Sequence, residues 1–210
     1  MRNQCVCVLV VGCALQQMIG AASLQAPSAI REFSCEAFPL NIGEAELVSR
    51  YGRENVRPAG IVGWDDGPQD GAVVFPDQED LKLEIIWADP RRTISSMRTR
   101  GTGGRWRSPD GITVGMDLKT IERRNGWPFR LSRFWGEGYP GHVLSWGNGR
   151  FRANGPGECA VEIYLLPVEG MTIDREVRRQ LNVRQFSSGH PAMQALNPRV
   201  YQMLIWNRPK

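Results

Sequence analysis

Apolar and polar residues alternate with a period of two in several short segments, and this pattern constrains the fold most strongly. The clearest segments are residues 81–88, with apolar side chains at Leu81, Leu83, Ile85 and Trp87, and residues 158–166, with Cys159, Val161, Ile163 and Leu165 on one side. Alternation of this kind predicts strands with one buried face. Because glycine and proline interrupt the chain between such segments, the sequence predicts short antiparallel strands.

Shorter segments are expected to form the remaining strands. They are residues 33–38, 72–75, 93–99, a segment near Trp106, 130–135, 142–146, 150–153 and 199–206. Residues 72–75 and 81–88 are separated by a turn that begins at Pro76, so we expect them to pair as a hairpin. Residues 60–71, which are dense in Gly, Asp and Pro, and residues 187–197 are expected to form loops.

Three segments carry helix signals. In the first, Asn41 is placed to cap a helix with Glu44 three residues later, and Gly52 ends it. The second contains apolar residues at Met116, Leu118 and Ile121 and is ended by Gly126 and Pro128. The third is the strongly charged segment 173–183. The predicted fold class is therefore α+β, with antiparallel sheet and short helices packed on one face.

A helix followed by antiparallel strands occurs twice, in residues 41–88 and 114–153. Aligning Gly52 with Gly126 pairs Arg50 with Arg124 and Leu47 with Ile121. This pattern suggests a duplicated unit of helix and sheet. Two organisations stay open, a single body over residues 27–210 or two subunits over residues 33–108 and 109–210.

Residues 1–26 have the composition of an export leader. A single charge at Arg2 precedes an apolar stretch, residues 5–15, and a run of small residues, 20–23. The apolar stretch is shorter than the roughly 20 residues that cross a bilayer. Cleavage after Ala22 or Ser23 is one expectation, acylation of Cys13 as a lipoprotein is another, and an uncleaved tail is a third. The protein is expected to be periplasmic or secreted.

Removal of the leader leaves two of the five cysteines, Cys35 and Cys159. An even pair suits an oxidising compartment, and the alternation in 158–166 places Cys159 on the buried side. We therefore expect a disulfide bond between Cys35 and Cys159. It would close a loop of more than one hundred residues.

Basic residues are concentrated between residues 91 and 107. The candidate ligand-binding residues in this segment are Arg98, Arg100 and Arg105, with Trp106 among them. Arginine beside an aromatic ring suits phosphate or carboxylate groups, lipid headgroups and glycans. Export and a net charge of only +4 make nucleic acid an unexpected partner. The alternative is an exposed segment whose arginine stems cover apolar neighbours.

Aromatic residues are densest between residues 127 and 146. The candidate binding residues there are Trp127, Trp135, Tyr139 and Trp146. The glycine-rich segment 136–141 can present Trp135 and Tyr139 on a loop, where large rigid side chains anchor protein interfaces. The alternative is that these rings form the core of a small sheet.

Signals for catalysis or metal binding are weak. The chain has only two histidines, His142 and His190, and no spacing typical of zinc ligands. The acidic segment 65–71 lacks the ligand pattern of a calcium loop. Ser188 and His190 are the best candidates for a nucleophile and its base, although no Gly-x-Ser-x-Gly motif surrounds Ser188. We expect no cofactor.

The second predicted helix also carries a family resemblance. The residues concerned are Gly115, Met116, Leu118, Ile121, Glu122, Asn125, Gly126, Pro128 and Phe129, followed by Trp135, Gly141, Ser145 and Trp146. This pattern resembles exported bacterial domains of unassigned function. It is also similar to the β-lactamase inhibitor proteins and the SmpA/OmlA-like lipoproteins of outer-membrane assembly, where a short helix lies across a small antiparallel sheet. The resemblance implies a binding or inhibitory module rather than an enzyme.

Two functions follow as expectations. The first is an exported, non-catalytic binding or inhibitory module that contacts an envelope protein or an anionic envelope polymer through its aromatic and arginine residues. It contacts the membrane only if Cys13 is acylated. The second is a periplasmic hydrolase that uses Ser188 and His190.

Overall fold

The computed structural model of the chain describes residues 29–63, 67–89, 91, 93–133, 140–151, 159–170, 172–181 and 184–207. Its strands are β1 (Arg31–Glu32), β2 (Val56–Val62), β3 (Pro68–Val74), β4 (Leu83–Asp89), β5 (Thr93–Arg100), β6 (Trp106–Arg107), β7 (Arg130–Ser132), β8 (Gly141–Ser145), β9 (Cys159–Leu166), β10 (Gln185–Ser187) and β11 (Arg199–Asn207). Its α-helices are α1 (Glu44–Tyr51), α2 (Leu118–Asn125), α3 (Arg175–Gln180) and α4 (Pro191–Leu196), and a short 3₁₀ helix, η1, spans Arg53–Asn55. The predicted leader, 1–26, with Cys13, lies outside the described residues.

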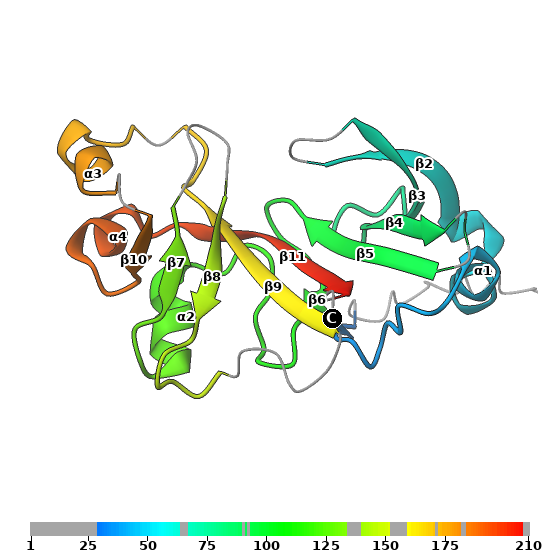
Figure 1. Cartoon of the computed structure of the whole chain (residues 1–210), viewed down its shortest axis with the longest axis horizontal. Coiled ribbons are helices and arrows are strands. Elements are labelled where there is room, and N and C mark those ends of the chain that lie inside the picture. The colour runs from blue at the N-terminus through cyan, green and yellow to red at the C-terminus, as the bar shows by residue number, and fades with distance from the viewer. Residues whose placement is uncertain are drawn as a thin grey trace, which may run out of the picture.

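Nine strands form one sheet in the order β10-β7-β8-β9-β11-β5-β4-β3-β2. Every neighbouring pair in it is antiparallel, whereas β1 and β6 form a separate parallel pair. Helix α1 lies at one end of the molecule and α2, α3 and α4 at the other, with β9 and β11 running between the two ends (Figure 1). The fold is therefore α+β, as the sequence predicts.

Strand register separates the two faces of the sheet. Ile85, Met97 and Ile205 are neighbours across β4, β5 and β11, and all three are fully buried. The adjacent row carries Glu84, Arg98 and Leu204, so the opposite face includes a pair of charged residues beside an apolar one. Core residues from both ends of the sheet belong to one hydrophobic cluster, which also includes Leu47 of α1 and Ile121 of α2. This continuity follows from the alternation seen in the sequence.

Each of the two longer helices precedes a run of neighbouring strands. After α1, strands β2 to β5 pair in sequence order, and after α2, strands β7 to β9 do the same. The last strand, β11, then lies between β9 and β5 and joins the two runs into one sheet.

Helix α2 ends at the glycine that the sequence predicts, whereas its N-cap residue was not predicted and Met116 lies before the helix. The Asp117 side chain caps it by accepting from the Thr120 N–H at 2.9 Å. At its other end Gly126 has a left-handed conformation, with φ of 77°, which a residue without a Cβ adopts at no steric cost. Helix α1 differs from prediction at its start, because Gly43 occupies the N-cap position and Asn41 lies two residues earlier.

Some predicted elements are wrong. Residues 34–38 form a turn rather than a strand, because the Ser34 hydroxyl accepts from the Ala37 N–H and the Ser34 carbonyl accepts from the Phe38 N–H. Residues 60–62 and 68–71, which were expected in a loop, belong to strands β2 and β3, and residues 191–196, also expected in a loop, form helix α4. Phe151 is buried outside any strand.

The predicted disulfide bond between Cys35 and Cys159 is present, with 6.0 Å between their Cα atoms. It ties the turn that precedes α1 to the first residue of β9. The two cysteines are 124 residues apart in sequence, so the bond connects the segment before the first run of strands to the second run.

Candidate functional site

The most exposed aromatic side chain in the described part of the chain is Trp127, which is 51% exposed. It follows α2 directly, in a turn that we define as residues 125–129 and call the Trp127 turn. Gly126 reverses the chain, and Pro128, which follows Trp127, is also exposed. A position for a Cβ on Gly147 would lie 3.0 Å from Trp127 Cδ1. The Trp127 ring therefore rests against the turn that follows β8.

Asn125 holds this turn in place from inside the protein. Its amide nitrogen donates to the carbonyl oxygens of Trp127 at 2.7 Å and Trp146 at 2.9 Å, and its amide oxygen accepts from the Phe151 N–H at 3.0 Å. Asn125 is completely buried. Because the Trp127 backbone is tied down, the exposed indole can contact a partner with little loss of backbone entropy.

Basic residues surround the Trp127 turn. Arg123 and Arg124 lie in the last turn of α2, and both are exposed. The exposed Arg150 lies over Gly126, since a Cβ on Gly126 would be 3.8 Å from Arg150 Nε. Its guanidinium makes no hydrogen bond or ion pair with a described residue. Arg124 donates only to the Gly111 carbonyl, at 3.0 Å.

The charge of the chain is unevenly distributed between its two halves. Residues 33–108 carry 10 basic and 12 acidic side chains, a net charge of −2, whereas residues 109–210 carry 14 basic and 9 acidic side chains, a net charge of +5. The Trp127 turn lies in the positive half. An exposed aromatic side chain in a positive region favours a partner with negative charge.

The other predicted aromatic residues divide into two groups. Trp146 is only 8% exposed, and its ring packs 5.2 Å from Phe129 and 5.2 Å from Phe151. Trp146 belongs to the core and is not part of a binding surface. Trp135 and Tyr139 lie outside the described residues.

The predicted arginine cluster is mostly engaged within the protein. Arg98 is 5% exposed, and its Nε donates to Glu84 at 2.6 Å while its terminal nitrogen donates to the Val62 carbonyl. Arg100 donates to the same carboxylate at 2.9 and 3.2 Å. The reason is register, because β5 places Arg98 directly opposite Glu84 of β4. These two guanidinium groups stabilise the sheet.

Arg105 and Trp106 also have structural contacts. Arg105 forms an ion pair with Asp80 at 2.6 Å. Trp106 is 2% exposed, and its indole nitrogen donates to the Leu81 carbonyl at 2.8 Å. Trp106 packs edge-on against Phe38, with ring centroids 5.4 Å apart. In this segment Trp106 is therefore a core residue, and the three arginines are paired with acidic residues of the protein. They do not form one free basic surface.

The residues suggested for hydrolysis are held in structural roles. Ser188 is completely buried, and its hydroxyl donates to Glu122 and accepts from the Phe129 N–H at 2.8 Å. His190 caps α4, with its Nδ1 accepting from the Ala192 N–H at 3.2 Å. A nucleophile has to reach substrate with its base beside it, and neither arrangement provides this.

The described residues hold no group of three or more His, Cys, Asp or Glu side chains that could bind a metal ion. The other histidine, His142, lies in β8, and its Nδ1 is 2.9 Å from the Ser132 hydroxyl. Tyr164 of β9 contacts the His142 ring and donates to Glu162 at 2.6 Å. Burial, together with this carboxylate, raises the pKa of Tyr164 well above 10. Tyr164 therefore remains a neutral hydrogen-bond donor.

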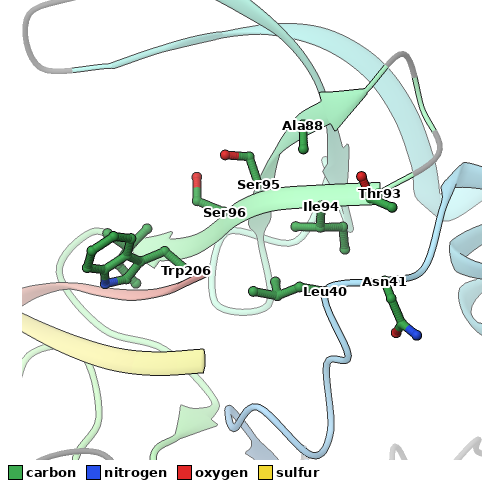
Figure 2. Close-up of a pocket in the computed structure, with 9 residues that line it drawn as sticks. Leu40, Asn41, Ala88, Thr93, Ile94, Ser95, Ser96 and Trp206 are labelled. Atoms are coloured by element: carbon green, nitrogen blue, oxygen red, sulfur yellow. The ribbon is translucent and has the colours of Figure 1, made fainter. Parts of the chain in front are cut away.

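A pocket of about 490 Å³ lies beside β5, at the end of β11 (Figure 2). Leu40 and Ile94 form its apolar side, and the hydroxyl groups of Ser95 and Ser96 lie on the opposite side, with Trp206 at one end. None of these residues was predicted from the sequence. The pocket arises where strand pairing is irregular, and the alternation pattern does not report such irregularities.

No family model, no curated protein sequence and no solved structure matches this chain. Among the described residues, no helix is both long enough and apolar enough to cross a membrane. A function for this site is therefore inferred from the geometry of its own residues.

Proposed function

We propose that this is an exported binding protein of the bacterial envelope, which contacts a negatively charged partner through the Trp127 turn. The partner is an envelope protein with an acidic surface or an anionic envelope polymer. The observation that supports this most directly is the 51% exposure of Trp127 on a backbone fixed by Asn125. Tryptophan and arginine are the residue types most often responsible for affinity at protein interfaces.

Export is supported by two features. Residues 1–26 have the pattern of a leader, and the disulfide between Cys35 and Cys159 suits an oxidising compartment. The engagement of Ser188 and His190 in structural hydrogen bonds favours binding over hydrolysis.

The first experiment measures capture of partners from a bacterial envelope extract by the immobilised protein. Trp127→Ala is expected to reduce capture at least about tenfold, since truncating an anchor residue typically costs more than about 1.4 kcal/mol. Arg150→Ala is expected to weaken capture mainly at low salt, because exposed charges act over a screening distance of about 10 Å at 0.1 M salt.

Val62→Ala provides the matched control. Val62 is 54% exposed, but it lies in the negative half of the chain, at the end of β2. Capture should be unchanged in this variant. Equal capture by wild type, Trp127→Ala and Arg150→Ala would refute the proposed binding surface.

A further inference from the structure

The pocket beside β5 is formed by this strand and by two neighbouring segments, the end of β11 and the segment before α1. Pairing between β11 and β5 ends at Trp206 and Ser96. Two residues earlier in β5, the segment before α1 pairs with the strand instead, and the Leu40 carbonyl accepts from the Ile94 N–H at 2.8 Å. Between Trp206 and Leu40 the edge of β5 is left open, and this gap is the pocket (Figure 2).

Two β-bulges shape the pocket. Ile86 pairs with Ser96 and Trp87 pairs with Ile94, so Ser95 is an extra residue on β5. Asp89 then pairs with Thr93, which makes Ala88 an extra residue on β4. Consecutive strand residues normally point to opposite faces, yet Ser95 and Ser96 both line the pocket. The bulge at Ser95 accounts for this, since bulges redirect side chains and often occur beside functional sites.

The lining has a distinct chemistry. Leu204 and Trp206 are partly exposed and offer apolar surface to a ligand, whereas Leu40 and Ile94, which are 8% and 1% exposed, offer little. The side chains of Asn41, Ser95 and Ser96 make no hydrogen bond to another described residue. Each of them can both donate and accept a hydrogen bond. Among the residues that the structure describes, no charged side chain lines the pocket, so these residues offer a ligand neither a cation nor an anion.

We propose that this pocket binds a small uncharged saccharide. A sugar ring has an apolar face, which suits Leu204 and the Trp206 indole, and a rim of hydroxyl groups, which suits side chains that donate and accept. The volume of about 490 Å³ lies in the range of about 300–1,000 Å³ typical of small-molecule sites. The site is separate from the Trp127 turn and does not depend on the function proposed for it.

The test uses the purified full chain, labelled with ¹⁵N, in NMR titrations of the tryptophan indole signals. The neutral probes are methyl glucoside, maltose and diacetylchitobiose. With at least one of them, the Trp206 indole signal should shift and saturate, with a Kd on the order of 1 mM. The Trp127 indole signal, from an exposed ring outside the pocket, should stay fixed and serves as the internal control.

Variants and further probes test whether the serine hydroxyls bind the ligand and whether the pocket prefers uncharged sugars. Ser95→Val and Ser96→Val should each weaken saccharide binding about tenfold, with the Trp127 signal confirming that the variants are folded. Glucuronate should bind more weakly than the neutral sugars, because the described lining residues include no cation. The proposal is overturned if no neutral sugar gives a saturable Trp206 shift, if Trp127 shifts equally, or if hexanol binds better and both valine variants retain that binding.

Discussion

At the scale of single residues, Asn125 links the core to the exposed surface. Its side chain makes three hydrogen bonds, to Trp127, Trp146 and Phe151, and its backbone carbonyl accepts from the Arg150 N–H at 2.7 Å. All of these partners belong to the turns after α2 and β8. A buried amide whose donors and acceptor are all used fixes the position of every group it contacts.

Replacing Asn125 should therefore destabilise the protein strongly. Asn125→Ala leaves two carbonyl oxygens and one N–H without a partner in a buried site, so we expect a loss of about 2–4 kcal/mol in the free energy of unfolding. Asn125→Asp should be similarly harmful, since a carboxylate cannot donate to the two carbonyls. Urea denaturation of both variants measures the loss.

Asn148→Ala is the matched control, because Asn148 is an exposed residue in the turn after β8. Its unfolding midpoint should match that of wild type. If Asn125→Ala also unfolded at the wild-type midpoint, the hydrogen bonds of Asn125 would not contribute to stability.

The sequence could identify the aromatic candidates but could not separate them. Trp127 and Trp146 both stand beside glycine or proline at the end of an element, and nothing local distinguishes an exposed ring from a buried one. The difference arises from tertiary packing, because Trp146 is enclosed by Phe129 and Phe151. The role of Arg98 was hidden for a similar reason, since its partner Glu84 is brought to it by strand register.

At the scale of elements, local signals explain which predictions succeeded. Strands β4, β9 and β11 have sustained apolar patterns, and α2 ends at a glycine that is followed two residues later by a proline. Strand β2 was missed because it contains Pro58 and Gly60, which are rare in strand interiors. It lies at the edge of the sheet, where proline is tolerated. Helix α4 was missed because Pro191 suggested a loop, whereas it occupies the first turn of the helix.

The cap of α2 predicts a dependence of stability on pH. Partial burial alone would raise the pKa of Asp117, but hydrogen bonds from the Thr120 N–H and hydroxyl outweigh this and hold the pKa below its ordinary value of 3.8. The folded state thus binds the proton less tightly than the unfolded state. The stabilisation is present above the unfolded pKa and is lost as the pH falls through the folded pKa.

Asp117→Asn tests this expectation. At neutral pH the variant should be less stable by about 0.5–1 kcal/mol, since it keeps a capping oxygen but loses the negative charge at the start of the helix. The difference should shrink to near zero under conditions acidic enough to protonate Asp117. Urea midpoints measured across this pH range give the result, with Asp70→Asn, an exposed change on β3, as the control for loss of one charge. A difference that stays constant with pH would contradict the assignment.

At the scale of the whole molecule, the two runs of strands are joined by β11, which pairs with β5 on one side and β9 on the other. Residues 202–206 of β11 pair with residues of β5 that lie about one hundred positions earlier in the chain. A sequence pattern identifies strands but not such distant partners, so the α+β class was predictable and the strand order was not. The bulges that shape the pocket depend on the same pairing and were hidden for the same reason.

The disulfide bond makes this long-range arrangement less costly to form, and its removal is the last test. Cys35 and Cys159 enclose a loop with a sequence separation of 124, for which the chain-entropy model gives up to about 5 kcal/mol of stabilisation. The double variant Cys35→Ser/Cys159→Ser should lower the urea midpoint by an amount equivalent to about 2–5 kcal/mol. Wild type in reducing agent should unfold at the same midpoint as the double variant, which separates loss of the bond from effects of the serines. An unchanged midpoint in both would show that the hydrophobic core shared by the two runs of strands holds the molecule together without the bond.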